Sequence, residues 1–170
     1  MIDTTRKSLP KVKAPEGGCL TDAMIAEFRE SGVLILEDFV SIADCNSLRA
    51  RTRELIEAFD PAEAPSVFST TDEEQLDDKY FIESGDKIRF FLEADAFDDT
   101  GNLRQSKEDS LNKMGHAMHD LDPIFDRFSH SAELAEIAKR IGFRDPGIIQ
   151  SMYIFKPPGI GGEVLCHQDS

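Results

Sequence analysis

Two residues near the end of the sequence, His167 and Asp169, have the types and the spacing of a metal chelate. Side chains on a β-strand alternate between its two faces, so residues two apart point to the same side and their ligand atoms can share one ion. A neutral imidazole and a carboxylate on one face, joined by a second histidine from elsewhere, form the facial triad of non-heme Fe(II) oxygenases. The alternative is a surface histidine beside an aspartate, because such a tripeptide also arises by chance.

The other candidate groups favour structural explanations. His116 and His119 are three residues apart, and on one helix face they could hold a zinc ion, but no cysteine or carboxylate pair accompanies them. Cys166 directly precedes His167, and adjacent strand residues face opposite sides, so these two cannot form a thiol–imidazole pair. His130 is expected at the surface.

Apolar spacing and turn residues predict helices first and strands last along the chain. Gly32 marks a helix end, and Ser41 with Asp44 three residues later is typical of a helix start. The acidic, proline-containing stretch 60–79 predicts a loop. This order indicates the α+β class. We expect helices at 22–31, 41–59, 106–119 and 131–141, and strands at 33–36, 87–92, 147–156 and 163–169.

Size and composition indicate one domain with a real core. The chain has 170 residues, of which 40% are hydrophobic and 31% charged, as in ordinary globular proteins. Its formal net charge of -14 repels polyphosphates, so we expect no nucleic-acid partner. The same charge disfavours a highly anionic substrate such as a CoA thioester.

Cysteine placement and hydropathy indicate a cytoplasmic protein. Cys19, Cys45 and Cys166 are scattered, so they form neither a disulfide framework nor a close-spaced zinc motif. No segment approaches the roughly 18 apolar residues of a membrane span. Residues 1–20 are expected to form a flexible leader, and residues 21–170 one domain.

Four stretches of the sequence resemble the phytanoyl-CoA dioxygenase family in order and spacing. The resemblance runs from about residue 21 to Ser170, and several long matches do not arise by chance as a tripeptide does. It therefore favours the metal-binding interpretation of His167 and Asp169. The stretches are 84–91 (SGDKIRFF), 112–119 (NKMGHAMH), 150–156 (QSMYIFK) and 161–164 (GGEV), the last leading into the His-Gln-Asp motif.

The resemblance implies a fold, a metal and a cosubstrate. The fold would be a double-stranded β-helix, a jelly roll of about eight strands, here preceded by helices. His167 and Asp169 would bind Fe(II), and 2-oxoglutarate would be the cosubstrate. Lys113 and Met152 lie where the relatives contact 2-oxoglutarate, and Lys113 would pair with a carboxylate as a point charge. The alternatives are that Lys113 is a solvated lysine on a helix and that Met152 is a methionine of the core.

The sequence departs from the family pattern in one respect. The family requires a distal histidine as third iron ligand and an arginine beyond it that holds the far carboxylate of 2-oxoglutarate. Both would lie past position 170, so we expect the C-terminal part of the barrel to be missing and the chain alone not to turn over 2-oxoglutarate. Strands left with open edges would favour self-association.

Two functions from different classes remain open. The first is an Fe(II)- and 2-oxoglutarate-dependent dioxygenase that hydroxylates an unidentified small molecule. The second is a non-catalytic short isoform or pseudoenzyme that binds a protein partner through its uncovered strands.

Overall fold

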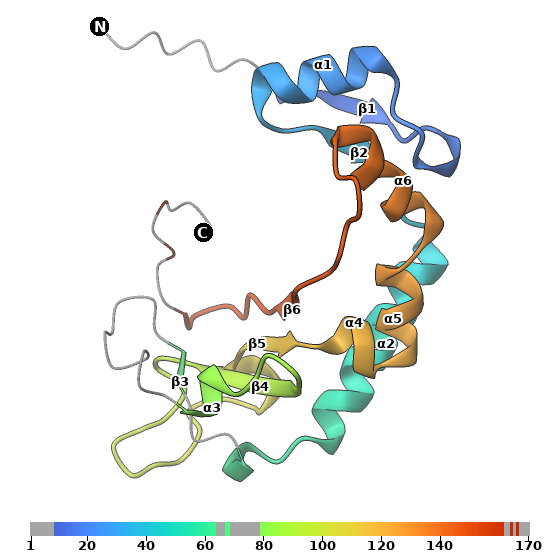
Figure 1. The fold of residues 1–170 in the computed structure, drawn as a ribbon. Coiled ribbons are helices and arrows are strands. Elements are labelled where there is room, and N and C mark those ends of the chain that lie inside the picture. Colours follow the sequence, from blue (N-terminus) through green and yellow to red (C-terminus); the bar gives the residue numbers. More distant parts are fainter. Residues whose placement is uncertain (1–8, 64–66, 69–78, 162–163, 165, 167–170) are drawn as a thin grey trace, which may run out of the picture.

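The computed structural model describes residues 9–63, 67–68, 79–161, 164 and 166. Helices and strands are both present, and the larger sheet is mainly antiparallel, which is compatible with the α+β class, although strands occur throughout these residues and not only after the helices (Figure 1). Among the described residues, no helix has both the length and the apolar character that crossing a membrane requires. The expected strand at 163–169 lies mostly outside the described residues, and so do the first eight residues of the expected leader.

The first folded unit is a small parallel sheet covered by a helix. Strand β1 (Lys11–Lys13) pairs with β2 (Ile35–Glu37), and helix α1 (Asp22–Ser31) connects them after the 3-10 turn η1 (Glu16–Gly18). Residues 11–13 and 16–18, which fall within the predicted leader at 1–20, form the strand β1 and the turn η1. Their apolar residues are few, but backbone pairing with β2 gives these residues a hydrogen-bonded partner that composition alone does not reveal.

Gly18 lies where this unit meets helix α6 (Ala132–Ile141). A Cβ at Gly18 would come within 2.4 Å of the Glu133 carbonyl oxygen, and the residue has a φ of +72°. Gly17, with a φ of +63°, has open space around it. We expect Gly18→Ala to lower the free energy of unfolding by about 2 kcal/mol more than Gly17→Ala, since only the former adds a backbone clash to the conformational strain. Urea unfolding measures both, and equal losses would contradict the clash.

Helix α2 (Ile42–Ala58) runs from the small sheet to the rest of the molecule (Figure 1). Its start is the predicted one: the Ser41 hydroxyl accepts the Asp44 backbone N–H at 3.0 Å. Thr52 and Ile56 are its buried residues. Helix α1 likewise has Thr21 as its cap and ends at Gly32, as predicted.

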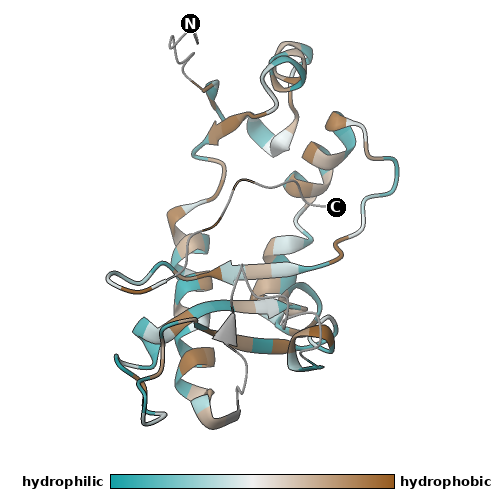
Figure 2. Cartoon of the chain, turned by 90° about the vertical axis from the view of Figure 1, so that its left-hand side faces the viewer, coloured by the Kyte–Doolittle hydropathy of each residue, from teal (hydrophilic) through white to brown (hydrophobic). Residues whose placement is uncertain are grey.

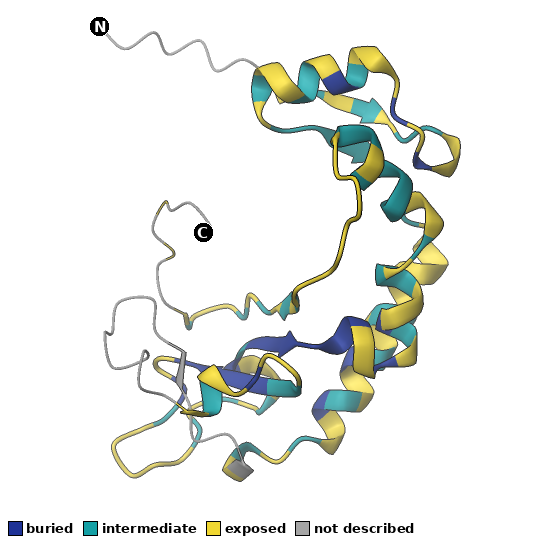
Figure 3. Cartoon of the chain, in the orientation of Figure 1, coloured by how far each residue is buried: buried dark blue, intermediate teal, exposed yellow. Residues whose placement is uncertain are grey.

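A four-stranded sheet forms the other end of the molecule. Its order is β3 (Val67–Phe68), β4 (Ile88–Glu93), β5 (Leu111–His116) and β6 (Ser151–Ile154), parallel between β3 and β4 and antiparallel between the others. The short elements around it are η2 (Pro61–Glu63), α3 (Lys79–Ile82) and η4 (Glu108–Ser110). β4 and β5 are the most buried strands, whereas β6 is half exposed (Figure 3).

The helix predicted at 106–119 is wrong. Residues 111–116 form strand β5, and only the 3-10 turn η4 (Glu108–Ser110) before it and the helix α4 (Met118–Leu121) after it are helical. A second short helix, α5 (Pro123–Ser129), follows and was not predicted. Leu111, Met114 and Met118 have helical spacing, but β5 is central and buried on both sides, so its apolar residues show no clear alternation. Pairing with β4 and β6 overrides the local pattern.

The core lies between one face of this sheet and the helices α2, α4 and α5. It consists of Ile56, Phe90, Leu92, Ala96, Leu111, Met114, Met118 and Phe125. Tyr153 of β6 packs against it, whereas Met152 and Ile154 on the same strand are exposed. The opposite face of the sheet therefore carries different side chains, and the candidate site lies on that face.

A groove of about 490 Å³ lies between α5, α6 and the connection from α6 to β6. Phe143 and Ile148 contribute to its mainly apolar lining. The connection is apolar where it approaches β6 (Figure 2), and Ile149 there is 91% exposed.

Candidate cosubstrate site

Lys113 occupies the middle of the central strand of the four-stranded sheet. Its cross-strand neighbours are Phe91 on β4 and Ile154 on β6. Directly opposed residues on paired strands share a face of the sheet, so the lysine stem lies on the face away from the helical core. Lys113 lies on strand β5, so the alternative that it is a solvated lysine on a helix is wrong.

The Lys113 side chain is buried against aromatic rings. It is 6% exposed, and its Nζ lies 5.1 Å from the centroid of the Phe81 ring and 5.4 Å from that of Phe91. Ring faces attract a cation, but they solvate it less well than water does. Burial therefore lowers the pKa of Lys113 from 10.5 to about 8. A carboxylate brought next to this ammonium would be held more strongly than by a lysine in water.

The lowered pKa predicts how Lys113 affects stability. Below pH 8 the amine is charged in both the folded and unfolded states, so folding carries the full cost of burying the charge. Between pH 8 and 10.5 the folded state releases the proton first, and this cost disappears. We expect Lys113→Met to raise the free energy of unfolding at pH 7 by about 2 kcal/mol, with the gain shrinking toward pH 10. Denaturant unfolding across this range measures it, and a gain independent of pH would contradict the argument.

Met152 lies on the same face of the sheet as Lys113. It is paired with Gly115 on β5, two pairs along from the pair of Lys113 with Ile154 and so on the same face. A Cβ at Gly115 would be 3.3 Å from the Ser151 carbonyl oxygen and 3.4 Å from Met152 Cγ, so glycine leaves room for the methionine. Met152 is 44% exposed, which excludes the alternative of a core methionine in the described structure. The sheet thus brings together two residues that are 39 positions apart in sequence.

Two further buried residues, Ser84 and His116, lie near Lys113 and contact each other. The Ser84 hydroxyl is 2.8 Å from Nδ1 of His116, and the two residues are 1% and 5% exposed. The imidazole packs against the rings of Phe81 and Phe91, with centroids 5.7 and 5.6 Å away. Burial, and then the charge of Lys113, lower the pKa of His116. The sequence favoured a structural role for His116 over a zinc ligand and did not link it to Ser84, for which the SGDK stretch was the available signal.

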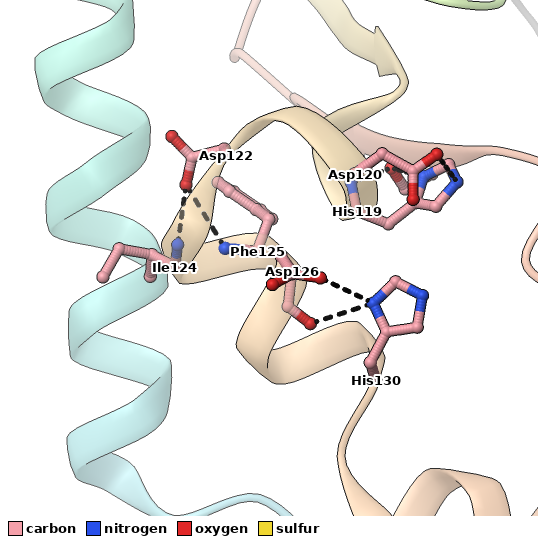
Figure 4. A network of polar contacts seen from close by, with 8 residues as sticks. His119, Asp120, Asp122, Ile124, Phe125, Asp126 and His130 are labelled. Carbon is pink, nitrogen blue, oxygen red and sulfur yellow. Dashed lines mark hydrogen bonds and ion pairs between the residues drawn. The ribbon is translucent and has the colours of Figure 1, made fainter.

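His116 and His119 do not share a helix face, because His116 ends β5 and His119 lies in α4. His119 is buried with Nδ1 2.9 Å from the Ser151 hydroxyl, whereas His130 is exposed with Nδ1 2.8 Å from Asp126 Oδ1 (Figure 4). The zinc alternative required both ligands on one helix, so it is wrong. His130 lies at the surface, as predicted.

The two metal ligands predicted from sequence, His167 and Asp169, lie outside the described residues. After β6 the structure describes the chain continuously as far as Gly161. Ile160 packs against the core, and a Cβ at Gly161 would be 3.2 Å from Oε1 of Glu93, a buried residue of β4. The segment preceding the motif is therefore anchored on the sheet that carries Lys113.

Comparison with known proteins decides the family. The model of the family described as Phytanoyl-CoA dioxygenase (PhyH) matches residues 28–170. The chain belongs to this family. The phytanoyl-CoA dioxygenase resemblance inferred from the four sequence stretches is thus confirmed.

Curated phytanoyl-CoA dioxygenase relatives come from animals and plants. Phytanoyl-CoA dioxygenase domain-containing protein 1 of Danio rerio is 49% identical over 156 residues, which cover 89% of this chain and 54% of that protein. Phytanoyl-CoA dioxygenase of Arabidopsis thaliana is 46% identical over 153 residues, 90% of this chain and 54% of that protein. Phytanoyl-CoA dioxygenase 1 of Oryza sativa subsp. japonica is 46% identical over 92% of this chain and 55% of its own length. The chain spans about half the length of these relatives.

Proposed function

We propose that this chain forms the N-terminal part of an Fe(II)- and 2-oxoglutarate-dependent dioxygenase, with Lys113 as a carboxylate-binding residue for 2-oxoglutarate. The observation that carries the proposal is the buried ammonium of Lys113 on the sheet face that it shares with Met152. A lysine ammonium is a point charge that can pair with a carboxylate, and its pairing is stronger where water is largely excluded, as on this face of the sheet. Family membership supports the dioxygenase class.

We propose His167 and Asp169 as two of the iron ligands. The donor set fits, because a neutral imidazole and a carboxylate are the ligand types of non-heme Fe(II) oxygenases. When bound, iron would supply the activation of dioxygen. The anchoring of Gly161 beside Glu93 supports this assignment, since it keeps the approach to the motif on the same sheet as Lys113.

The side chains of this region would bind and shield the cosubstrate. Lys113 would neutralise one carboxylate, and Met152 would contact the carbon skeleton from the next strand. Phe81 and Phe91 would keep water from the lysine, since their rings lie within 5.1 and 5.4 Å of its Nζ. The protein's part is thus to orient a dianion and to hold a dry surface.

The wider fold belongs to the same proposal. We place the four-stranded sheet as the first strands of a double-stranded β-helix whose remaining strands would lie outside this chain. In the described part of the chain, β6 pairs on one side only, and its exposed Met152 and Ile154 suit coverage by further strands. The proposed substrate is a small molecule with an aliphatic C–H bond, and the net charge of -14 argues against a CoA thioester. We propose the cytoplasm as its location, consistent with three free, exposed cysteines.

The metal assignment can be tested on the complete protein product of the gene. Under anaerobic conditions we expect it to bind Fe(II), and we expect His167→Ala and Asp169→Ala to abolish this binding and the release of succinate from 2-oxoglutarate. Asp145→Ala, which alters an exposed aspartate, is the control. Iron binding that survives both substitutions would refute the assignment. The 170-residue chain alone is expected to release no succinate.

The second candidate function is a protein-interaction module. It is favoured by the exposed Met152 and Ile154, 44% and 53%, on a strand that pairs on one side only among the described residues. Such an edge can add a strand from a partner or from a second copy. Sedimentation with Ile154→Lys tests it: loss of association together with absent iron binding would favour the module over the dioxygenase.

A further inference from the structure

A small pocket of about 190 Å³ lies between helix α2 and the end of strand β6. Arg49 and Arg53 of α2 contribute to its lining, and so do Tyr153 of β6 and Phe155 just after it. The two aromatic rings have their centroids 5.1 Å apart. Tyr153 packs against the core, on the face of the sheet opposite to Lys113, so this pocket is separate from the candidate cosubstrate site.

The two arginines of the pocket carry like charges one turn apart on α2. Residues four apart on a helix are neighbours, and a like-charged pair at this spacing destabilises the helix. Neither Arg49 nor Arg53 makes an ion pair or a hydrogen bond with a described residue. Arg51 on the same helix, by contrast, is paired with Asp122 and Glu54. Helix α2 therefore places two adjacent positive charges at the pocket that the described fold does not neutralise.

The lining of the pocket is positive on balance. Its one acidic residue is Glu108 of η4, which is exposed and makes no ion pair with either arginine in the described structure. The neighbouring Lys107 donates to the carbonyl oxygens of Glu57 and Phe59 at the end of α2, at 3.2 and 2.7 Å. Two guanidinium groups thus outnumber one carboxylate in the lining, in a chain whose formal net charge is -14. Such a local reversal of sign attracts an anion.

The pocket also offers hydrogen-bond donors that the described fold does not use. Each guanidinium presents N–H groups in a planar fork. The Tyr153 hydroxyl is on a half-buried side chain and has no hydrogen bond with a described residue, whereas the Thr52 hydroxyl donates to the Leu48 carbonyl at 2.9 Å. A carboxylate has two oxygens in one plane, which a single fork matches. A tetrahedral phosphate can accept from two forks and a phenol at once.

We propose that this pocket binds the phosphate group of a small phosphate ester, with Arg49 and Arg53 contacting its oxygens and Tyr153 as a further donor. Pockets for drug-sized molecules have about 300–1,000 Å³, so a pocket of about 190 Å³ suits a smaller ligand. Ile56 and Phe155 supply apolar surface for its organic part. The inference goes beyond the proposed dioxygenase function and does not depend on it, because the pocket lies on the other face of the sheet.

Calorimetric titration of the complete protein product with phenyl phosphate tests the role of the arginines. We expect Arg49→Gln and Arg53→Gln each to weaken binding about tenfold, since each removes a charge-assisted contact. Arg29→Gln, which alters an exposed arginine on α1, is the matched control and should bind as the unsubstituted protein does. Equal affinities in all three variants, or no binding by the unsubstituted protein, would overturn the proposal.

A comparison of ligands tests the chemical class. Phenyl phosphate should bind more tightly than inorganic phosphate, and inorganic phosphate about tenfold more tightly than acetate. An ester that bound no more tightly than the free ion would overturn the assignment to an ester, and acetate binding as tightly as phosphate would overturn the phosphate specificity. Tyr153→Phe should weaken phosphate binding about threefold. Binding of 2-oxoglutarate should be unchanged in Arg49→Gln and Arg53→Gln, and a loss there would contradict a separate site.

Discussion

Lys113→Met is expected to weaken 2-oxoglutarate binding by about 2 kcal/mol, or about thirtyfold, in the complete protein product. The substitution keeps the length of the side chain and its contact with Phe81 and Phe91, but removes the charge that would pair with a carboxylate. The lysine is 6% exposed, so water cannot take over its role. Calorimetric titration with 2-oxoglutarate measures the loss.

The pH dependence distinguishes this effect from a general disturbance. Binding by the unsubstituted protein is expected to decline as pH rises through about 8, where the Lys113 amine loses its proton in the absence of 2-oxoglutarate. Binding by Lys113→Met should show no such decline. Lys139→Met removes an exposed lysine on α6 and serves as the matched control. If the two methionine variants bound 2-oxoglutarate equally well, Lys113 would have no part in cosubstrate binding.

Asp122→Ala is expected to lower the free energy of unfolding by about 2 kcal/mol. Asp122 is 1% exposed, and it joins α2 to α5: Oδ2 lies 2.6 Å from Nε of Arg51, and Oδ1 accepts the backbone N–H groups of Ile124 and Phe125 (Figure 4 shows the two backbone contacts). The substitution leaves Arg51 with Glu54 as its carboxylate partner and the first turn of α5 without its cap. Thermal and urea unfolding measure the loss.

Two variants separate the contributions at Asp122. Asp122→Asn can still cap α5 through its amide oxygen, so it should lose less stability than the alanine variant. Asp126→Ala, which alters an exposed aspartate on α5, is the control and should cost under 1 kcal/mol, roughly the ceiling for exposed pairs. A loss at Asp122 no larger than that at Asp126 would contradict the role of the buried ion pair.

Acid should weaken the same contact. Burial alone would raise the pKa of Asp122, but hydrogen bonds from Arg51 and from the backbone of Phe125 and Ile124 outweigh it and hold the pKa below 3.8. The contact between Asp122 and Arg51 therefore stabilises the fold fully at pH values above the pKa of an aspartate in the unfolded chain. This stabilisation is lost as pH falls through the lower pKa that Asp122 has in the folded protein.

Local signals in the sequence were enough to predict three of the helices, α1, α2 and α6. Thr21, Ser41 and Ser131 precede α1, α2 and α6, and Gly32 and Gly142 follow two of them, so each boundary depends on residues within one turn. These elements agree with prediction to within a residue or two.

Strand β5 could not be predicted in this way, because its paired residues on β4 and β6 come from 19 to 41 positions away. Its residues Leu111 and Met114 are buried by β4, β6 and the helices together, and no local pattern separates such a strand from a helix. For the same reason the sequence pointed to Lys113 and Met152 through family resemblance alone. The proximity of Ser84 to His116, 32 residues apart, appears only in three dimensions. The metal assignment of His167 and Asp169 stays a prediction.

The pairing of β5 also protects the sheet against misalignment. Shifting one strand by a single residue exchanges its two faces, which would drive the Lys113 ammonium among Ile56, Met118 and Phe125. An unpaired charge in that hydrocarbon interior would be prohibitively unfavourable. The group proposed to recognise 2-oxoglutarate would therefore also discriminate the native strand register from its nearest competitor during folding.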